Sequence, residues 1–244
     1  MKSISVSTID LGIVCPMANE EFAAESFVRE VLQQCTGFRS VRLFAVLDRV
    51  SRDNTLNILK DLALELPELQ VIFAPENRCV VDAYVRGYKE ALAAGCDWIL
   101  EIDAGYSHQP SDIPQFFHIM SQGYDCVFGS RFCKGGRMTG GVKRYLVSYG
   151  GTALTNLLLG TKLKDMTSGF ELFNCFTLNS ILDRGIRSRG HFFQTEIKFY
   201  CRNFNLAEVP INYKVDGNSV NSTAIQDALK NLWRLFVLRI RGKA

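Results

Sequence analysis

Hydrophobic and polar positions along this chain alternate between the spacing of strands and the spacing of helices. Short apolar runs predict strands over residues 10–15, 41–47, 70–74, 98–100, 125–130 and 206–213. Apolar residues three and four apart predict helices over about 20–34, 54–66, 80–94, 111–122, 143–159, 176–184, 193–203 and 222–240. This alternation predicts an α/β fold with a mainly parallel, Rossmann-like sheet and helices on both faces.

Ligands of such sheets bind at the carboxyl ends of the strands. Four polar segments stand where the apolar runs stop, namely CPMANEE (15–21), LDRVSRDNT (47–55), EIDAGYSH (101–108) and GSRFCKGG (129–136). The sequence therefore directs the search for chemistry to these four segments.

The composition is that of an ordinary globular protein, with 244 residues, 47% hydrophobic and 22% charged. We find no repeat or linker, which favours a single domain over 1–244. The net charge of +3 is too small to indicate nucleic acid. No apolar run is long enough to span a bilayer, and the first residues do not resemble a signal peptide. The eight cysteines lack CxxC spacing, which favours reduced thiols and a cytoplasmic protein.

Two acidic residues follow the predicted strand 98–100. Alternate strand residues share a face, so we expect Glu101 and Asp103 to point the same way. Like charges this close need a cation or a protonation shift to offset their repulsion. A divalent metal bound to a diphosphate would serve, and a basic partner for Glu101 is the structural alternative. Ser107 and His108 are candidates to complete the site.

Two aspartates flank the loop after the strand 41–47. Asp48 lies at the strand end and Asp53 at the start of the next helix. A carboxylate at position 48 would accept hydrogen bonds from a nucleobase or ribose, or would cap neighbouring amides. The residues by themselves leave both roles open.

A basic stretch interleaved with four glycines follows the strand 125–130. Its cations are Arg131, Lys134, Arg137, Lys143 and Arg144. Glycine allows a ligand to approach the backbone closely, and arginine binds phosphate through two hydrogen bonds. The stretch is neither a Walker loop nor a GxGxxG motif. It is a candidate diphosphate clamp, and a solvated loop is the alternative.

Seven segments carry a family resemblance over about residues 10–215. VCPMANEE is similar to a P-x-x-N-E motif, LDRVSRDNT to D-D-x-S-x-D-x-T, and IDAGYSHQP to D-A-D-x-S-H-x-P. GSRFCKGG, KDMTSGFELF, FQTE and EVPI follow in the matching order. Together they resemble the inverting glycosyltransferases of family 2, most closely the dolichyl-phosphate mannose synthase group.

The resemblance implies a GT-A fold and a nucleotide-sugar donor over the carboxyl edge of the sheet. It implies that Asp48 contacts the base, that Asp103 binds Mg²⁺ or Mn²⁺ and that Arg131 binds the diphosphate. The implied catalytic residues are Asp103, Asp165, Arg131 and Glu196. The implied donor-binding residues are Pro16, Asn19, Glu20, Asp48, Asp53, Asp103, Arg131, Lys134, Ser168 and Gln194, with Gln194 and Glu196 facing one cleft.

Three positions depart from the family pattern. Gly105 replaces the second acid of the D-A-D triplet, and Arg49 replaces the second acid of the D-D pair. Our hypothesis is that Glu101 supplies the lost metal ligand beside Asp103; otherwise the metal binds weakly or not at all. The loop after EVPI (212–222) lacks the family's usual arginine and lysine, which leaves the donor's identity open.

The expected reaction moves a hexose from a nucleotide-sugar to a polyprenyl (dolichyl-type) phosphate or to a glycan. A phosphate oxygen is already ionised near neutral pH, whereas a sugar hydroxyl needs a carboxylate base. Asp165 is the first candidate for that base and Glu196 the second. The alternative is a non-catalytic nucleotide-sugar-binding protein of the same fold.

The last predicted helix, about 222–240, is amphipathic. Its apolar stripe consists of Leu229, Leu232, Trp233, Phe236 and Ile240. Cations surround the stripe, so the helix suits peripheral contact with an anionic membrane, at the inner face of that membrane for a cytoplasmic protein. Packing of the same stripe on the rest of the domain is the alternative.

Overall fold

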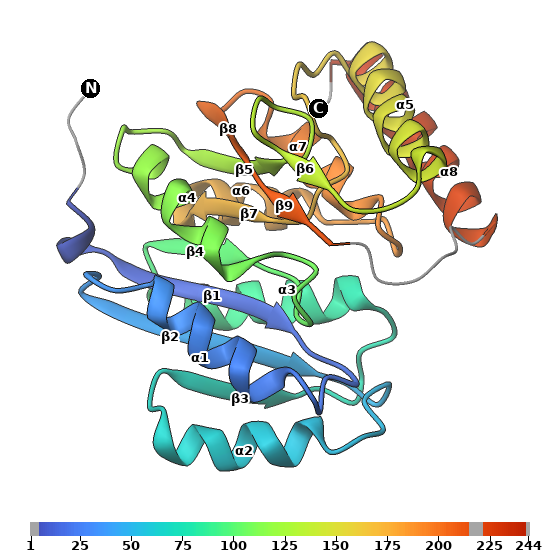
Figure 1. The fold of residues 1–244 in the computed structure, drawn as a ribbon. Coiled ribbons are helices and arrows are strands. Elements are labelled where there is room, and N and C mark those ends of the chain that lie inside the picture. The colour runs from blue at the N-terminus through green and yellow to red at the C-terminus, as the bar shows by residue number, and fades with distance from the viewer. Residues whose placement is uncertain (1–4, 215–221, 243–244) are drawn as a thin grey trace.

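Seven strands form one central sheet in the order β3-β2-β1-β4-β7-β5-β8 (Figure 1). In this computed structural model, residues 5–214 and 222–242 are described. The strands are β1 Asp10–Pro16, β2 Ser40–Leu47, β3 Leu69–Phe73, β4 Trp98–Glu101, β5 Cys126–Ser130, β7 Glu171–Asn174 and β8 Leu206–Pro210. All neighbours pair in parallel except β7, which runs antiparallel to β4 and β5. The prediction of a mainly parallel sheet is confirmed, and the reversal of β7 was not predicted.

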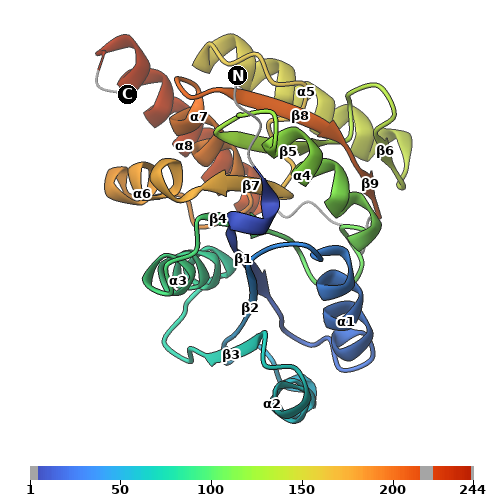
Figure 2. The ribbon, with the colours of Figure 1, turned by 90° about the vertical axis from the view of Figure 1, so that its left-hand side faces the viewer.

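Helices cover both faces of this sheet, as predicted (Figure 2). The helices are α1 Ala24–Gln34, α2 Thr55–Glu65, α3 Val80–Ala93, α4 Ile113–Met120, α5 Val142–Leu159, α6 Cys175–Arg184, α7 Phe193–Cys201 and α8 Ser222–Ile240, with short 3₁₀ turns at Val6–Thr8 and Pro110–Asp112. Side chains of α1, α2 and α4 join one buried core, and those of α3, α6 and α7 join a second core on the opposite face.

The apolar runs become strands because both faces of the sheet are covered. In β1, Leu11 and Ile13 belong to the first core and Val14 belongs to the second, and all three are fully buried. The alternation of a strand thus sends successive side chains into different cores. The same double burial explains why these strands read as continuous apolar runs.

Two boundaries differ from the sequence prediction in ways that shape the site. The helix expected from residue 20 begins at Ala24, so residues 17–23 are free to form a loop after β1. The strand expected to reach residue 213 ends at Pro210, and Asn212–Tyr213 form β9, which pairs with β6 (Arg137–Met138) in a separate two-stranded sheet.

The helices α5 and α8 lie side by side at one end of the molecule (Figures 1 and 2). In α8, Leu232 and Leu235 are buried, whereas Leu229, Trp233 and Ile240 are 55%, 66% and 68% exposed. Part of the predicted stripe therefore packs on the domain and part faces outward. Within the described ranges, none of the helices combines the length and the hydrophobicity needed to cross a bilayer.

Candidate active site

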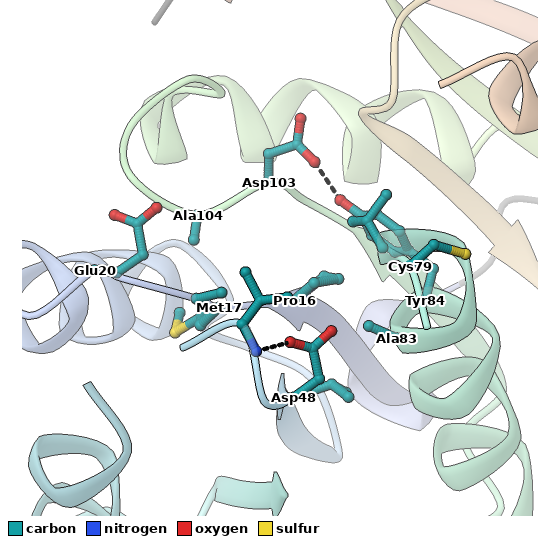
Figure 3. Close-up of a pocket in the computed structure, with 13 residues that line it drawn as sticks. Pro16, Met17, Glu20, Asp48, Cys79, Ala83, Tyr84, Asp103 and Ala104 are labelled. Carbon is teal, nitrogen blue, oxygen red and sulfur yellow. Dashed lines mark hydrogen bonds between the residues drawn. The ribbon is translucent and has the colours of Figure 1, made fainter. Parts of the chain in front are cut away.

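The carboxyl ends of β1, β2 and β4 meet at one edge of the sheet, because these strands are neighbours and run parallel. A cavity of about 290 Å³ opens at this edge (Figure 3). Four of the predicted donor-binding residues line it: Pro16, Glu20, Asp48 and Asp103. Each of the three strands contributes at least one of them through the segment at its carboxyl end.

Asp103 is fixed in direction and still open to the cavity. The hydroxyl group of Tyr84, on α3, donates a hydrogen bond to its carboxylate (Figure 3), and its side chain remains 38% exposed. Its backbone N–H donates to Nδ1 of His108 at 3.0 Å. Because Nδ1 accepts that bond, the imidazole is neutral, and its burial lowers the pKa of His108. His108 is therefore the neutral member of this pair.

The loops after β1 and β2 are tied together below the cavity. Asn19, at a positive φ of 62°, donates through Nδ2 to the carbonyl of Val50 at 3.1 Å and accepts from the N–H of Arg52 at 3.0 Å. Asp53 accepts hydrogen bonds from the N–H groups of Glu21 and Thr55 at 3.0 and 3.1 Å. Asn19 and Asp53 thus shape the predicted donor site and do not line it.

Asp48 lies across the cavity from Asp103 (Figure 3). Its Oδ1 accepts the N–H of Val50 at 2.8 Å, and the residue is 8% exposed. The structure thus shows the capping role of Asp48, while contact with a nucleobase or ribose stays a prediction that its place in the cavity lining supports.

The hypothesis that Glu101 is a metal ligand does not fit its surroundings. Glu101 does share a face with Asp103, as predicted, because its carboxylate contacts Tyr88, one helical turn from Tyr84 on α3. It is fully buried, and its other oxygen accepts a hydrogen bond from Gln194. Burial raises the pKa of Glu101 well above its ordinary value, and Glu171 raises it further. Its oxygens are therefore engaged inside the core, one strand repeat below the cavity.

Arg131 and Asp165 form a buried pair at the end of β5. The Nε and Nη2 groups of Arg131 donate to the two oxygens of Asp165, both at 2.7 Å, and its backbone N–H donates at 3.0 Å. Burial alone would raise the pKa of Asp165, but the hydrogen bonds and charge of Arg131 outweigh it and lower that pKa. Asp165 is therefore an anchor for Arg131, an arrangement that does not favour its predicted role as a base.

Arg131 is not among the residues that line the cavity. Its guanidinium also stacks near the rings of Phe132 and Tyr213, at 5.2 and 5.4 Å from their centroids. The ring of Tyr213 lies 5.4 Å from that of His108, which binds the backbone of Asp103. The two predicted parts of the site are thus joined through these rings.

Gln194 and Ser168 belong to a buried polar layer below the cavity. Lys198 is fully buried, and its ammonium donates to the carbonyl of Ser168 and to Glu171. Burial raises the pKa of Glu171 to about 7, although Lys198 opposes that rise. The layer holds the turn at 167–169 in place and leaves Ser168 and Gln194 without direct access to the cavity.

Glu196 does not face the same cleft as Gln194, contrary to the prediction. Residues two apart on a helix point in nearly opposite directions, and FQTE lies on α7. The carboxylate of Glu196 accepts from Ser188 at 2.6 Å and from Arg234 of α8. Burial is outweighed by these hydrogen bonds, so the pKa of Glu196 is lowered. Glu196 thus joins two helices and a loop.

Most of the remaining cations of the basic stretch are exposed, whereas Arg144 is half-buried. Lys134, Arg137 and Lys143 are exposed, and Lys134 does not line the cavity. Sequence reasoning also missed Tyr84, whose ring lines the cavity and whose hydroxyl orients Asp103. Tyrosines at positions 84 and 88 on one helix, beside acids at 101 and 103, were the available signal.

The fold and the site together define a class of protein. An open α/β sheet carries an acidic cavity at the ends of β1, β2 and β4, with a buried arginine–carboxylate pair at the end of β5 in the same sheet. This is the arrangement of a GT-A glycosyltransferase that uses a nucleotide-sugar donor. The chain belongs to glycosyl transferase family 2, whose model matches residues 12–184.

Two curated relatives share much of the sequence. The chain is 29% identical over 195 residues to the undecaprenyl-phosphate mannosyltransferase of Micrococcus luteus, covering 78% of this chain and 80% of that protein. It is 26% identical over 235 residues to the polyprenol monophosphomannose synthase of Mycolicibacterium smegmatis, covering 95% and 87%.

Solved structures share the fold. The chain superposes on glucosyl-3-phosphoglycerate synthase from Mycobacterium tuberculosis in complex with Mn²⁺, uridine diphosphate and phosphoglyceric acid, with a TM-score of 0.64 and 16% identity over 95% of this chain and 78% of that one. The same enzyme with Mg²⁺ and uridine diphosphate gives 0.63 and 17%, over 95% and 79%. The GT-A fold is thereby confirmed.

The cavity suits a divalent cation only if the phosphates of the nucleotide-sugar supply the remaining ligands of that cation. Within the parts of the chain that the structure describes, no three His, Cys, Asp or Glu residues gather as a metal site. Asp103 and Glu20 nevertheless line one cavity. Burial is the main cause that raises the pKa of the Cys15 thiol, and the charges of Asp103 and Glu20 raise that pKa further. Mg²⁺ is commonly held by one or two carboxylates together with substrate phosphates. The carboxylates of Asp103 and Glu20 fit a cation of that kind.

Proposed function

We propose that this glycosyltransferase moves a hexose, with inversion at the anomeric carbon, from a nucleotide-sugar to the phosphate of a polyprenyl lipid. The observation that carries the choice of acceptor is the bidentate pairing of Asp165 with Arg131 at 2.7 Å. The activities named for the two curated relatives support the same acceptor class and favour mannose as the sugar.

The state of the acidic residues argues against a hydroxyl acceptor. A sugar hydroxyl must lose a proton as it attacks, and the base should have a pKa near the working pH. The two candidates, Asp165 and Glu196, are buried, paired with arginines and lowered in pKa. A lipid phosphate oxygen is already ionised, so it attacks without a base. Its bond to the anomeric carbon forms as the bond to the diphosphate breaks.

The residues at the edge of the sheet then have distinct roles. Asp48 and Pro16 would border the nucleoside, and Asp103 would hold a divalent cation, which when bound would supply positive charge for the diphosphate. Arg131 lies beside this region, held by Asp165, where its charge favours the anionic leaving group and the acceptor phosphate. Tyr84 orients Asp103 through its hydroxyl group.

A lipid acceptor requires contact with a bilayer, and α8 offers an outer surface for it. Leu229, Trp233 and Ile240 are exposed there, and the neighbouring α5 exposes Tyr145 and Leu146. Trp and Tyr favour the membrane interface, and nearby cations favour anionic lipids. We therefore propose a peripheral protein that reaches its acceptor through the outer faces of α8 and α5.

Transfer from defined donors tests the proposed function. GDP-mannose, UDP-glucose and UDP-N-acetylglucosamine are each incubated with the full chain, Mn²⁺ and a short polyprenyl phosphate in detergent. We expect a polyprenyl-phosphate hexose from one donor, detected by mass spectrometry, and a β-configured product from an α-configured donor. Transfer to soluble glycans with no lipid product would overturn the choice of acceptor, and hydrolysis alone would overturn the transfer.

A further inference from the structure

The volume that a side chain at position 105 would enter is already occupied. Gly105 has a positive φ of 69° in the turn after Asp103. A Cβ atom built on it would lie 2.7 and 2.8 Å from the two carboxylate oxygens of Glu20. Cβ atoms essentially never come within 3.0 Å of a heavy atom outside their own and the neighbouring residues. The carboxylate of Glu20 thus stands where the side chain of the lost acid would begin.

Glu20 reaches this point from a different strand. It follows β1, whereas Gly105 follows β4, and the two strands pair directly. The N–H of Glu20 donates to Oγ1 of Thr55 at 2.7 Å, and the adjacent Asn19 binds the loop after β2. Position 20 is therefore anchored through the backbone, while its carboxylate lines the same cavity as Asp103 (Figure 3).

The replacement matches in chemistry as well as in place. The family resemblance puts an acid at position 105, and hard divalent cations take carboxylate oxygens as ligands. Glu101, the replacement suggested by strand periodicity, is engaged with Tyr88 and Gln194 in the core. The carboxylate of Glu20 instead occupies the volume next to the Cβ position of residue 105.

We infer that Glu20 supplies the second carboxylate ligand of the divalent cation, in the place that Gly105 leaves, beside Asp103. The inference rests on the proposed use of a nucleotide diphosphate donor. It makes Gly105 a functional substitution, because a Cβ at position 105 would displace the Glu20 carboxylate from its present place.

The first test measures metal binding without turnover. The full chain is saturated with a nucleoside diphosphate, GDP or UDP, and titrated with Mn²⁺, and free Mn²⁺ is followed by electron paramagnetic resonance. We expect Glu20→Gln to weaken Mn²⁺ binding at least tenfold, as Asp103→Asn does. The matched control Glu25→Gln removes an exposed carboxylate of α1 that pairs with Arg29, and should bind Mn²⁺ as the wild type does.

The second test exchanges the two positions. Gly105→Asp alone should weaken Mn²⁺ binding, because its Cβ collides with Glu20. Aspartate is among the residues that tolerate a positive φ best, so the strain itself is modest. In the double variant Glu20→Ala/Gly105→Asp the collision is gone and an acid returns at position 105. We expect this variant to bind Mn²⁺ at least fivefold more tightly than Glu20→Ala.

The outcomes separate this inference from the proposed function. If Glu20→Gln binds Mn²⁺ like the wild type, or if the double variant binds no better than Glu20→Ala, the role of Glu20 is overturned while transfer stands. If the wild type binds Mn²⁺ no better with nucleoside diphosphate than without it, the inference is overturned as well. Failure of lipid-phosphate transfer with intact Mn²⁺ binding overturns the proposed acceptor alone.

Discussion

The two halves of the sheet use carboxylates in opposite ways. At the ends of β1, β2 and β4, the side chains of Glu20, Asp48 and Asp103 line a cavity. Around β5, β7 and α7, three buried carboxylates each have a cationic partner. These pairs are Asp165 with Arg131, Glu171 with Lys198, and Glu196 with Arg234.

The difference separates ligand chemistry from support. A buried charge is costly unless it is paired and hydrogen-bonded, so each pair fixes the elements that carry it. The carboxylates of Glu20, Asp48 and Asp103 instead line the cavity, where a ligand can reach them. Acidic residues that look alike in the motifs thus divide into two groups. One group lines the cavity, and the other forms buried ion pairs that support the structure around it.

The largest expected effect is the loss of a paired cation. Lys198→Met would leave Glu171 buried without its partner. Removing one member of a buried pair typically costs about 3–5 kcal/mol of unfolding free energy. Urea denaturation of the variant and the wild type measures the loss.

The matched control for this prediction removes both charges. Lys198→Met with Glu171→Gln should recover a large part of the lost unfolding free energy, because no uncompensated charge remains. If Lys198→Met is as stable as the wild type, the buried pair of Lys198 and Glu171 does not stabilise the fold, which would contradict the supporting role given to the buried ion pairs.

The next effect concerns the open edge and activity. Asp103→Asn should lower kcat/KM on the order of 100-fold, because the diphosphate loses its cation contact in the transition state. That equals about 2.7 kcal/mol of barrier. Unfolding free energy should change by less than about 1 kcal/mol, since the side chain is partly exposed. Near-normal activity in this variant would remove Asp103 from the site.

A smaller effect appears in the pH dependence of stability. The pKa of Glu196 is lowered in the folded state, so the folded protein binds fewer protons and gains stability above the unfolded pKa of about 4.3. This gain is lost as the pH falls through the lower folded pKa. Glu196→Gln should therefore be less stable than the wild type at pH 7, by about 1–3 kcal/mol. The gap should narrow towards pH 3 in urea denaturation series, and a gap that stays constant would contradict the assignment.

The smallest effect on stability is expected at the outer face of α8. Trp233→Glu should change the unfolding free energy by about 0.5 kcal/mol or less, because the side chain is 66% exposed. Co-sedimentation with anionic vesicles should nevertheless fall several-fold at low salt. Phe176→Glu on α6, also exposed, is the matched control and should sediment like the wild type. Equal sedimentation of both variants would refute the proposed membrane contact.

Most of the helices and strands can be predicted from the sequence, because hydrophobic periodicity is a local property. The strand at residues 10–15 and the helix at 143–159 are found within one or two residues of their predicted bounds. The segments at the strand ends were likewise placed at one edge by the parallel-sheet rule, and Pro16, Glu20, Asp48 and Asp103 do meet there. The direction of β7 was out of reach, since a short apolar strand reads the same in either direction.

The sequence by itself determined the fold class, the family and the edge of the sheet that carries the cavity, because these depend on local pattern and ordered motifs. Only the tertiary structure decided which carboxylates are buried in ion pairs and which line the cavity. Asp165 and Glu196 meet arginines 34 and 38 residues away along the chain, and those partners depend on how distant segments pack. The same holds for Glu20, whose contact with Gly105 joins two loops 85 residues apart, so burial and partners, more than residue type, assign the roles.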